Sequence, residues 1–197
     1  MDETTHGFSR KVIDRALTLD YGEFYPNRFD LFYEGQPENY VFHWSLLTSA
    51  RQEQLADTQD PDGQLSIAFL SQVNQVLKRT PFELAYRALN ELLLYVACFQ
   101  PKEEAELQAV WDDFLMTKVL PRIDGDDDKL RIMIDGKDAN LLDKLMAVLA
   151  DSLQAIWENP RPDLFRKVDE GIACRSRKKL EWMKNRLESH TFTSYWP

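Results

Sequence analysis

Four of the five aspartates between residues 124 and 135 have the residue type and part of the spacing of a calcium-binding loop. Asp124, Asp126, Asp128 and Asp135 fall at positions 1, 3, 5 and 12 of an EF-hand-like loop. Such a loop needs glycine at position 6 for its sharp turn and a bidentate glutamate at position 12. Here Lys129 stands at position 6 and an aspartate at position 12. A solvated acidic turn is therefore the better interpretation, and no metal site is predicted.

The basic run Arg175-Ser176-Arg177-Lys178-Lys179 is a candidate for contacts with phosphates. Residues 160–197 carry nine Lys or Arg against five Asp or Glu, a net charge of +4, whereas the rest of the chain carries −13. More often such a run is the solvated face of a helix, here one that packs through Leu180, Met183 and Leu187. The acidic bulk argues against a chain devoted wholly to nucleic acid.

Several catalytic patterns are missing from the sequence. No Gly-x-x-x-x-Gly-Lys-Ser/Thr loop is present, so nothing predicts a cradle for a β-phosphate. The apolar run that ends at Asp135 supplies one carboxylate, not the pair that a Walker B strand presents to Mg²⁺. His6, His43 and His190 lie far apart and show no ligand spacing. By itself the chain is not expected to hydrolyse nucleotide.

Composition predicts a folded helical protein. Of the 197 residues 44% are hydrophobic and 12% aromatic, and only 7 Gly and 9 Pro interrupt the chain. Cys98 and Cys174 are too few for a disulfide framework, and the apolar surroundings of Cys98 predict a buried side chain. No stretch approaches the length of a membrane span and no signal peptide is evident, so we expect a cytoplasmic protein.

Apolar periodicity and proline positions predict the helices. The expected segments are 42–56, 63–79, 82–99, 102–120, 139–158 and 175–189. Apolar stripes, clearest in 82–99 and 139–158, must be covered by other helices, which predicts a helical bundle. A short helix over 8–16 and a brief strand over 16–21 are expected before them. That strand needs partners, which the sequence does not identify.

Four local patterns resemble the C-terminal half of McrB-like AAA+ NTPases. The first comprises Asp2-Glu3-Thr4-Thr5-His6 and Lys11-Val12-Ile13-Asp14-Arg15-Ala16, similar to the stretch after the sensor I strand. Tyr86-Arg87-Ala88-Leu89-Asn90-Glu91 resembles the lid helix, with Ala85 where relatives often carry Gly. Lys118-Val119-Leu120-Pro121-Arg122-Ile123-Asp124-Gly125 resembles the family's Lys-Val-Leu-Pro turn. Ser176, Lys179-Leu180, Met183 and Phe192-Thr193-Ser194-Tyr195-Trp196 resemble its last helix and tail.

This resemblance implies roles for three arginines. An arginine after the sensor I segment of AAA+ proteins reaches the γ-phosphate of the neighbouring subunit, where its guanidinium neutralises developing charge. Arg15 is the candidate for this trans-acting finger, and Arg10 is the second choice. Arg87 is the candidate sensor II residue that contacts nucleotide from the lid. The alternatives are a local pair of Arg15 with Asp14 or Glu3, and a surface ladder of Arg87 with Glu83 and Glu91.

The resemblance also implies a complete motor of which this chain is a part. Residues 1–25 are expected to be a remnant of the AAA+ core with its last strand, and residues 26–197 a helical lid-like domain. The chain alone holds no cofactor, and ATP or GTP with Mg belongs to the complete motor. Expected partners are the AAA+ core and neighbouring subunits, a McrC-like nuclease subunit, and DNA indirectly, in a restriction or phage-defence system. The alternatives are a free-standing helical interaction module without NTPase activity, and direct nucleic-acid binding through residues 175–186.

Overall fold

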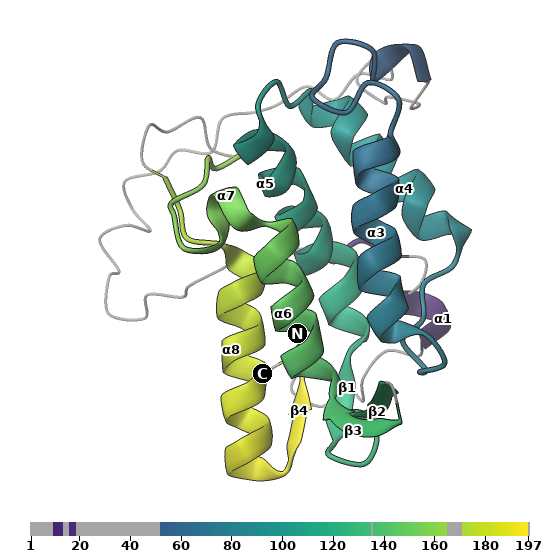
Figure 1. Cartoon of the computed structure of the whole chain (residues 1–197), viewed down its shortest axis with the longest axis vertical. Coiled ribbons are helices and arrows are strands. Elements are labelled where there is room, and N and C mark those ends of the chain that lie inside the picture. Colours follow the sequence, from purple (N-terminus) through teal and green to yellow (C-terminus); the bar gives the residue numbers. More distant parts are fainter. Residues whose placement is uncertain (1–9, 14–15, 19–51, 135, 165–170, 197) are drawn as a thin grey trace, which may run out of the picture.

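The structure is a computed structural model that describes residues 10–13, 16–18, 52–134, 136–164 and 171–196. Within these residues helices dominate and strands are short, so the mainly α architecture expected from the sequence is confirmed (Figure 1). The helices are α1 (Arg10–Ile13), η2 (Gln52–Gln54), α3 (Gln64–Leu77), α4 (Tyr86–Phe99), α5 (Glu104–Phe114), α6 (Leu141–Ser152), α7 (Gln154–Trp157) and α8 (Arg175–His190).

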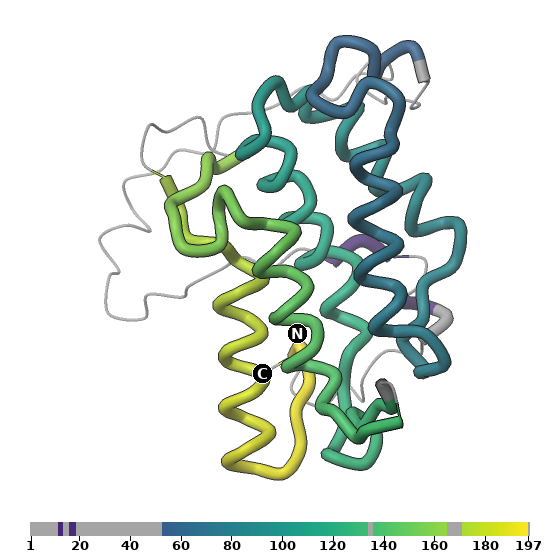
Figure 2. Tube along the Cα trace, viewed as in Figure 1, coloured from purple at the N-terminus to yellow at the C-terminus, as the bar shows by residue number. Residues whose placement is uncertain are grey.

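Helix α5 lies at the centre of the bundle. It packs against α4 on one side and against α7 and α8 on the other, while α3 packs against α4 and α6. Figure 2 shows the path of the chain through these layers, with α8 alongside α6. All residues from 107 to 121 are buried. A helix that is buried all round must satisfy its own polar side chains inside the protein.

The beginning and end of α5 are encoded locally. Glu103 and Glu106 form a reciprocal capping box at its first turn. The helix then widens into a π-helical turn, η3 (Leu115–Val119), and closes with a 3₁₀ turn, η4 (Leu120–Arg122). Pro121 has no N–H group to donate to the carbonyl of Thr117, four residues earlier, so regular α-helix cannot continue.

Two small antiparallel pairs complete the described structure. β1 (Asp124–Asp126) pairs with β4 (Phe192–Ser194), so the tail lies beside the end of η4. β2 (Arg131–Ile134) and β3 (Lys137–Asn140) form a hairpin whose turn includes Gly136, with a positive φ of 76°. Asn140 then caps α6 by accepting a hydrogen bond from the amide of Leu142 at 2.8 Å.

The expected helix 82–99 begins later than its apolar pattern predicts, at Tyr86. The side chain of Asn74 explains the delay, because it bonds both backbone groups of Leu84. Asn74 Oδ1 accepts from the Leu84 amide at 2.7 Å, and its Nδ2 donates to the Leu84 carbonyl at 3.2 Å. These bonds hold Leu84 outside the helix while Phe82 remains buried. The lid-helix pattern Tyr86–Glu91 therefore coincides with the first turns of α4.

Other expectations differ in detail. The expected helix 139–158 is divided into β3, α6 and α7, and of the expected helix 42–56 only 52–56 is described, with η2 inside it. Of the expected strand 16–21, residues 16–18 are described and belong to no strand, while 19–21 lie outside the described residues. Among the described residues, no helix has the length and apolar character needed to cross a membrane.

Candidate functional site

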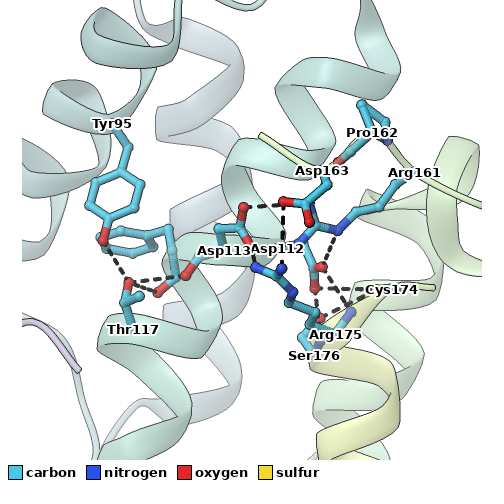
Figure 3. A network of polar contacts seen from close by, with 11 residues as sticks. Tyr95, Asp112, Asp113, Thr117, Arg161, Pro162, Asp163, Cys174, Arg175 and Ser176 are labelled. Atoms are coloured by element: carbon cyan, nitrogen blue, oxygen red, sulfur yellow. Dashed lines mark hydrogen bonds and ion pairs between the residues drawn. The ribbon is translucent and has the colours of Figure 1, made fainter. Parts of the chain in front are cut away.

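Four buried polar residues of the α5–η3 segment organise the centre of the protein. Asp112, Asp113, Thr117 and Lys118 are all at most 7% exposed. Burial of polar or charged groups costs free energy unless they are bonded, so their partners define the main polar contacts of the interior. The two aspartates face the segment before α8, and Thr117 faces α4 (Figure 3).

Asp112 caps α8 from another helix. One carboxylate oxygen accepts from the Ser176 amide at 2.8 Å, and the other accepts from the Arg175 amide at 2.9 Å. The thiol of Cys174 also donates to Asp112, at 3.3 Å. α8 has no side-chain cap of its own and no acidic residue in its first turn. The carboxylate therefore supplies both the acceptors and the negative charge that a helix N-terminus favours.

Arg161 joins the two aspartates. Its side chain is fully buried, with Nε at 2.7 Å from Asp112 and Nη2 hydrogen-bonded to Asp113. Arg175 adds a second bond to Asp113 at 2.8 Å and lies 3.6 Å from Asp163. We call Asp112, Asp113, Arg161 and Arg175 the carboxylate–arginine cluster (Figure 3). Burial raises the pKa of Asp113, and the two arginines oppose that rise.

The carboxylate–arginine cluster has a structural function in this chain. Its carboxylates are occupied by guanidinium groups and by backbone amides of α8. It fixes the segment around Arg161 and the start of α8 to the central helix. One signal in the sequence could have indicated this cluster, namely the acidic pair Asp112-Asp113 inside an otherwise apolar stretch. The sequence does not show which residues bond to this pair.

Thr117 and Lys118 connect α4 with the N-terminal segment. Glu91 forms an ion pair with Lys118 at 2.7 Å, and the Tyr95 hydroxyl donates to Thr117 Oγ1 at 2.9 Å. Burial raises the pKa of Tyr95, and the bond to Thr117 lowers it by less. Lys118 Nζ also donates to the carbonyl of Ala16 at 3.3 Å. We call Glu91, Tyr95, Thr117 and Lys118 the α4 clamp.

The structure describes the three arginines that are expected to contact nucleotide in different detail. Arg15 lies outside the described residues, and only the backbone of Arg10 is described, in α1. Arg87 lies in the first turn of α4, exposed and without an ion pair to another described residue. The alternative interpretation of Arg87 was a surface ladder of ion pairs with Glu83 and Glu91, and this ladder is not formed. Glu91 pairs with Lys118, and Glu83 precedes the helix and accepts from the Arg79 amide.

The acidic turn and the basic run are largely engaged within the protein. Asp124 pairs with Lys129 and Asp128 with Arg131, while Asp135 lies outside the described residues. No group of three His, Cys, Asp or Glu side chains that could hold a metal ion occurs in the described part of the chain. Arg177, from the basic run, pairs with Glu158 and Glu181.

Cys98 is exposed, which corrects the expectation of a buried side chain. Within α4, Val96 and Ala97 face the core and Cys98 is turned to solvent. Cys174, by contrast, is 2% exposed, and burial, followed by the nearby Asp112, raises the pKa of its thiol to about 12.

We expect a thiol reagent at pH 8 to modify Cys98 and to spare Cys174 in the folded protein, because reaction requires an accessible thiolate. Titration of the native chain should give about one reactive thiol, and titration in denaturant about two. Cys98→Ser is the control that should leave the native chain unreactive. Rapid modification of Cys174 in that variant would contradict the burial described above.

The comparisons with known proteins identify the family. A family model described as a domain of unknown function, DUF8727, matches residues 47–192, and the chain belongs to this family. The match covers the helices from η2 to α8 and ends at the first residue of β4. No curated protein and no solved structure matches the chain.

Proposed function

We propose that the chain is the C-terminal part of a McrB-like AAA+ NTPase motor of a DNA restriction or phage-defence system. It contributes the helical lid and the trans-acting arginine, and it is inactive alone. The proposal rests on the resemblance of four segments, and one structural observation supports it. These segments are distant in sequence, yet they meet at one end of the bundle.

The segment Lys118–Gly125 is the place where they meet. We call residues 10–18 the finger segment, because they include both candidate arginines. Lys118 pairs with Glu91 from the lid-helix pattern and donates to Ala16 from the finger segment. A few residues later β1 pairs with β4, which belongs to the pattern of the tail. Contacts of this kind are what the proposal requires of four segments that belong to one structural unit. Their convergence at one end of the bundle is consistent with the order of the four patterns in the proposed motor.

Surface features at this end fit the contact with a nucleotide-holding core. Val12, Leu17 and Tyr86 are exposed by 48%, 51% and 93%, although they are large and apolar. All three belong to the finger segment or to the first turn of α4. Arg87 is exposed beside Tyr86. A guanidinium in this position can contact phosphate held by another domain.

We infer that ATP or GTP with Mg is not held by this chain itself. Phosphate binding in this class requires the glycine-rich loop, which the sequence lacks. In the proposed motor the nucleotide is held by the core, Arg87 contacts it from the lid of the same subunit, and Arg15 approaches the nucleotide of the neighbour. A McrC-like nuclease subunit, contact with DNA through the assembled motor and a cytoplasmic location belong to the same proposal.

The proposal predicts no saturable binding of fluorescent ATP or GTP to the purified chain at micromolar concentrations. Hydrolysis should begin when the chain is mixed with an AAA+ core that carries Walker A and Walker B motifs, encoded directly upstream. Tight nucleotide binding by the chain alone, unchanged by Arg87→Ala, would contradict the proposal. The same measurement on Arg131→Ala controls for general loss of positive charge.

The family match favours one alternative, a free-standing helical interaction module. The match begins at residue 47, after the finger segment, and the helices it covers share one buried core. This alternative predicts an independent promoter and start, without an in-frame core upstream. Sequencing of the upstream DNA distinguishes the two.

A further inference from the structure

Three polar residues lie on one side of α4, each four positions after the last. They are Arg87, Glu91 and Tyr95, and this spacing places side chains above one another on a helix. Their surroundings differ. Arg87 is exposed, whereas Glu91 and Tyr95 bond to consecutive residues of η3, Lys118 and Thr117. An ion pair and a hydrogen bond therefore tie this side of α4 to η3.

The same two residues of η3 hold the finger segment. Lys118 Nζ donates to the carbonyl of Ala16 at 3.3 Å, and the amide of Thr18 donates to the carbonyl of Thr117 at 2.9 Å. Ala16 directly follows Arg15 in the sequence. The bonded carbonyl is therefore in the residue next to the candidate finger.

The helical irregularity at η3 makes this contact possible. In a regular α-helix the carbonyl of Thr117 would accept from the amide of residue 121. That residue is Pro121, which has no amide hydrogen, so the carbonyl is available to Thr18. π-helical turns occur frequently at functional sites, and this one provides a backbone acceptor in a buried position.

The burial of the Lys118–Glu91 pair makes the contact stiff. The side chain of Lys118 is 2% exposed and that of Glu91 19%, so solvent screens their attraction far less than in a surface pair. The hydroxyl bond between Tyr95 and Thr117 adds a second point of attachment one turn further along α4. Two attachments resist both sliding and rotation of η3 against α4.

We propose that the α4 clamp is a positioning device that links the helix bearing Arg87 to the segment bearing Arg15. This inference rests on the proposed function. A nucleotide that contacts Arg87 fixes α4, and the clamp transmits that position to Ala16–Thr18. The nucleotide at Arg87 thereby acts on residues 16–18, which directly follow the candidate finger Arg15 in the sequence. Glu91, Tyr95, Thr117 and Lys118 act as positioning residues and touch no reacting atom.

The test on the chain itself uses the double variant Glu91→Leu/Lys118→Met. It removes both charges together, because an apolar replacement of a whole buried pair is often tolerated, whereas one remaining charge is not. Amide exchange measured by NMR should become at least about 10-fold faster at Thr18 and remain unchanged in α8. Tyr95→Phe, which keeps the ring, should accelerate the same amide by a smaller factor.

The matched control is Asp143→Leu/Lys184→Met. It removes an ion pair of the same length, 2.7 Å, that joins α6 and α8 at the surface. In this control variant the amide of Thr18 should exchange at the same rate as in the natural chain. If Thr18 exchanges equally slowly in the Glu91→Leu/Lys118→Met chain, the clamp does not hold the finger segment and the inference is wrong.

The motor assay separates this inference from the proposed function. In the assembled motor, Glu91→Leu/Lys118→Met should lower kcat and leave KM for the nucleotide unchanged. Its effect should not add to that of Arg15→Ala, since both act through one group. Full activity of the double variant would overturn the positioning role. If the natural chain fails to stimulate any core, the proposed function and the role of Arg15 are wrong, while the exchange result still decides the clamp.

Discussion

Arg161→Met should destabilise the protein by about 3–5 kcal/mol, the loss expected when one partner of a buried charge network is removed. Arg161 is fully buried and bonds both Asp112 and Asp113. Methionine retains much of the side-chain volume, so the loss is electrostatic. Without the guanidinium two buried carboxylates repel each other, with only Arg175 to offset them. Thermal unfolding should shift down by roughly 6–20 °C for a chain of this size.

Arg177→Met is the matched control. It removes a guanidinium from the same region, but this side chain is 30% exposed and pairs with Glu158 and Glu181. Exposed pairs contribute about 0–1 kcal/mol, so its melting temperature should hardly change. Arg161→Met/Asp113→Leu should recover part of the lost stability, because one unpaired carboxylate is removed as well. Equal stability of the two single variants would mean that the interior charges are hydrated or protonated.

Arg15→Ala should reduce the NTPase activity of the assembled motor by about 10³-fold or more in kcat, as loss of an arginine finger does. The guanidinium neutralises charge on the γ-phosphoryl group only as the transition state forms. Nucleotide binding by the core should therefore remain. Arg15→Lys should rescue little, since an ammonium group does not reproduce the planar bidentate donor. Phosphate release at saturating nucleotide and Mg measures the effect.

Two further variants serve as the control and as the test of the second candidate arginine. Arg131→Ala removes an exposed arginine of β2 and should leave the rate unchanged. Arg10→Ala tests the second candidate in the finger segment. If Arg10→Ala abolishes turnover and Arg15→Ala does not, the roles are exchanged. If neither matters, the segment before Ala16 supplies no catalytic group.

The sequence predicted the helices well where local chemistry determines them. Proline and apolar spacing located α3, α8 and the continuous segment from α5 to η4 to within a few residues, because these signals act along a single helix. The start of α4 was missed since Asn74, distant in sequence, holds Leu84 outside the helix. The exposure of Cys98 was missed because an apolar neighbourhood does not say which side of the helix faces water.

The candidate site was less predictable, for a different reason. The Glu91–Lys118 and Asp112–Arg161 pairs join residues from different elements. A charged residue in a sequence has several possible partners, and only the tertiary packing selects one. Sequence spacing suggested a ladder of Glu91 with Arg87, which is a reasonable surface arrangement. Burial of Lys118 in η3 overrides it, since an unpaired buried ammonium would cost far more than an exposed pair contributes.

The cap that Asp112 provides for α8 has a consequence for the order in which the protein folds. Arg175, Arg177 and Lys178 place positive charge at the helix end that disfavours it, and the helix carries no acid there to compensate. The first turn of α8 therefore gains little from its own sequence and is stabilised when it docks on Asp112. The carboxylate that receives the Arg175 amide lies 63 residues earlier in the chain. During synthesis the acceptor helix emerges first, and the last helix has a folded surface on which to form.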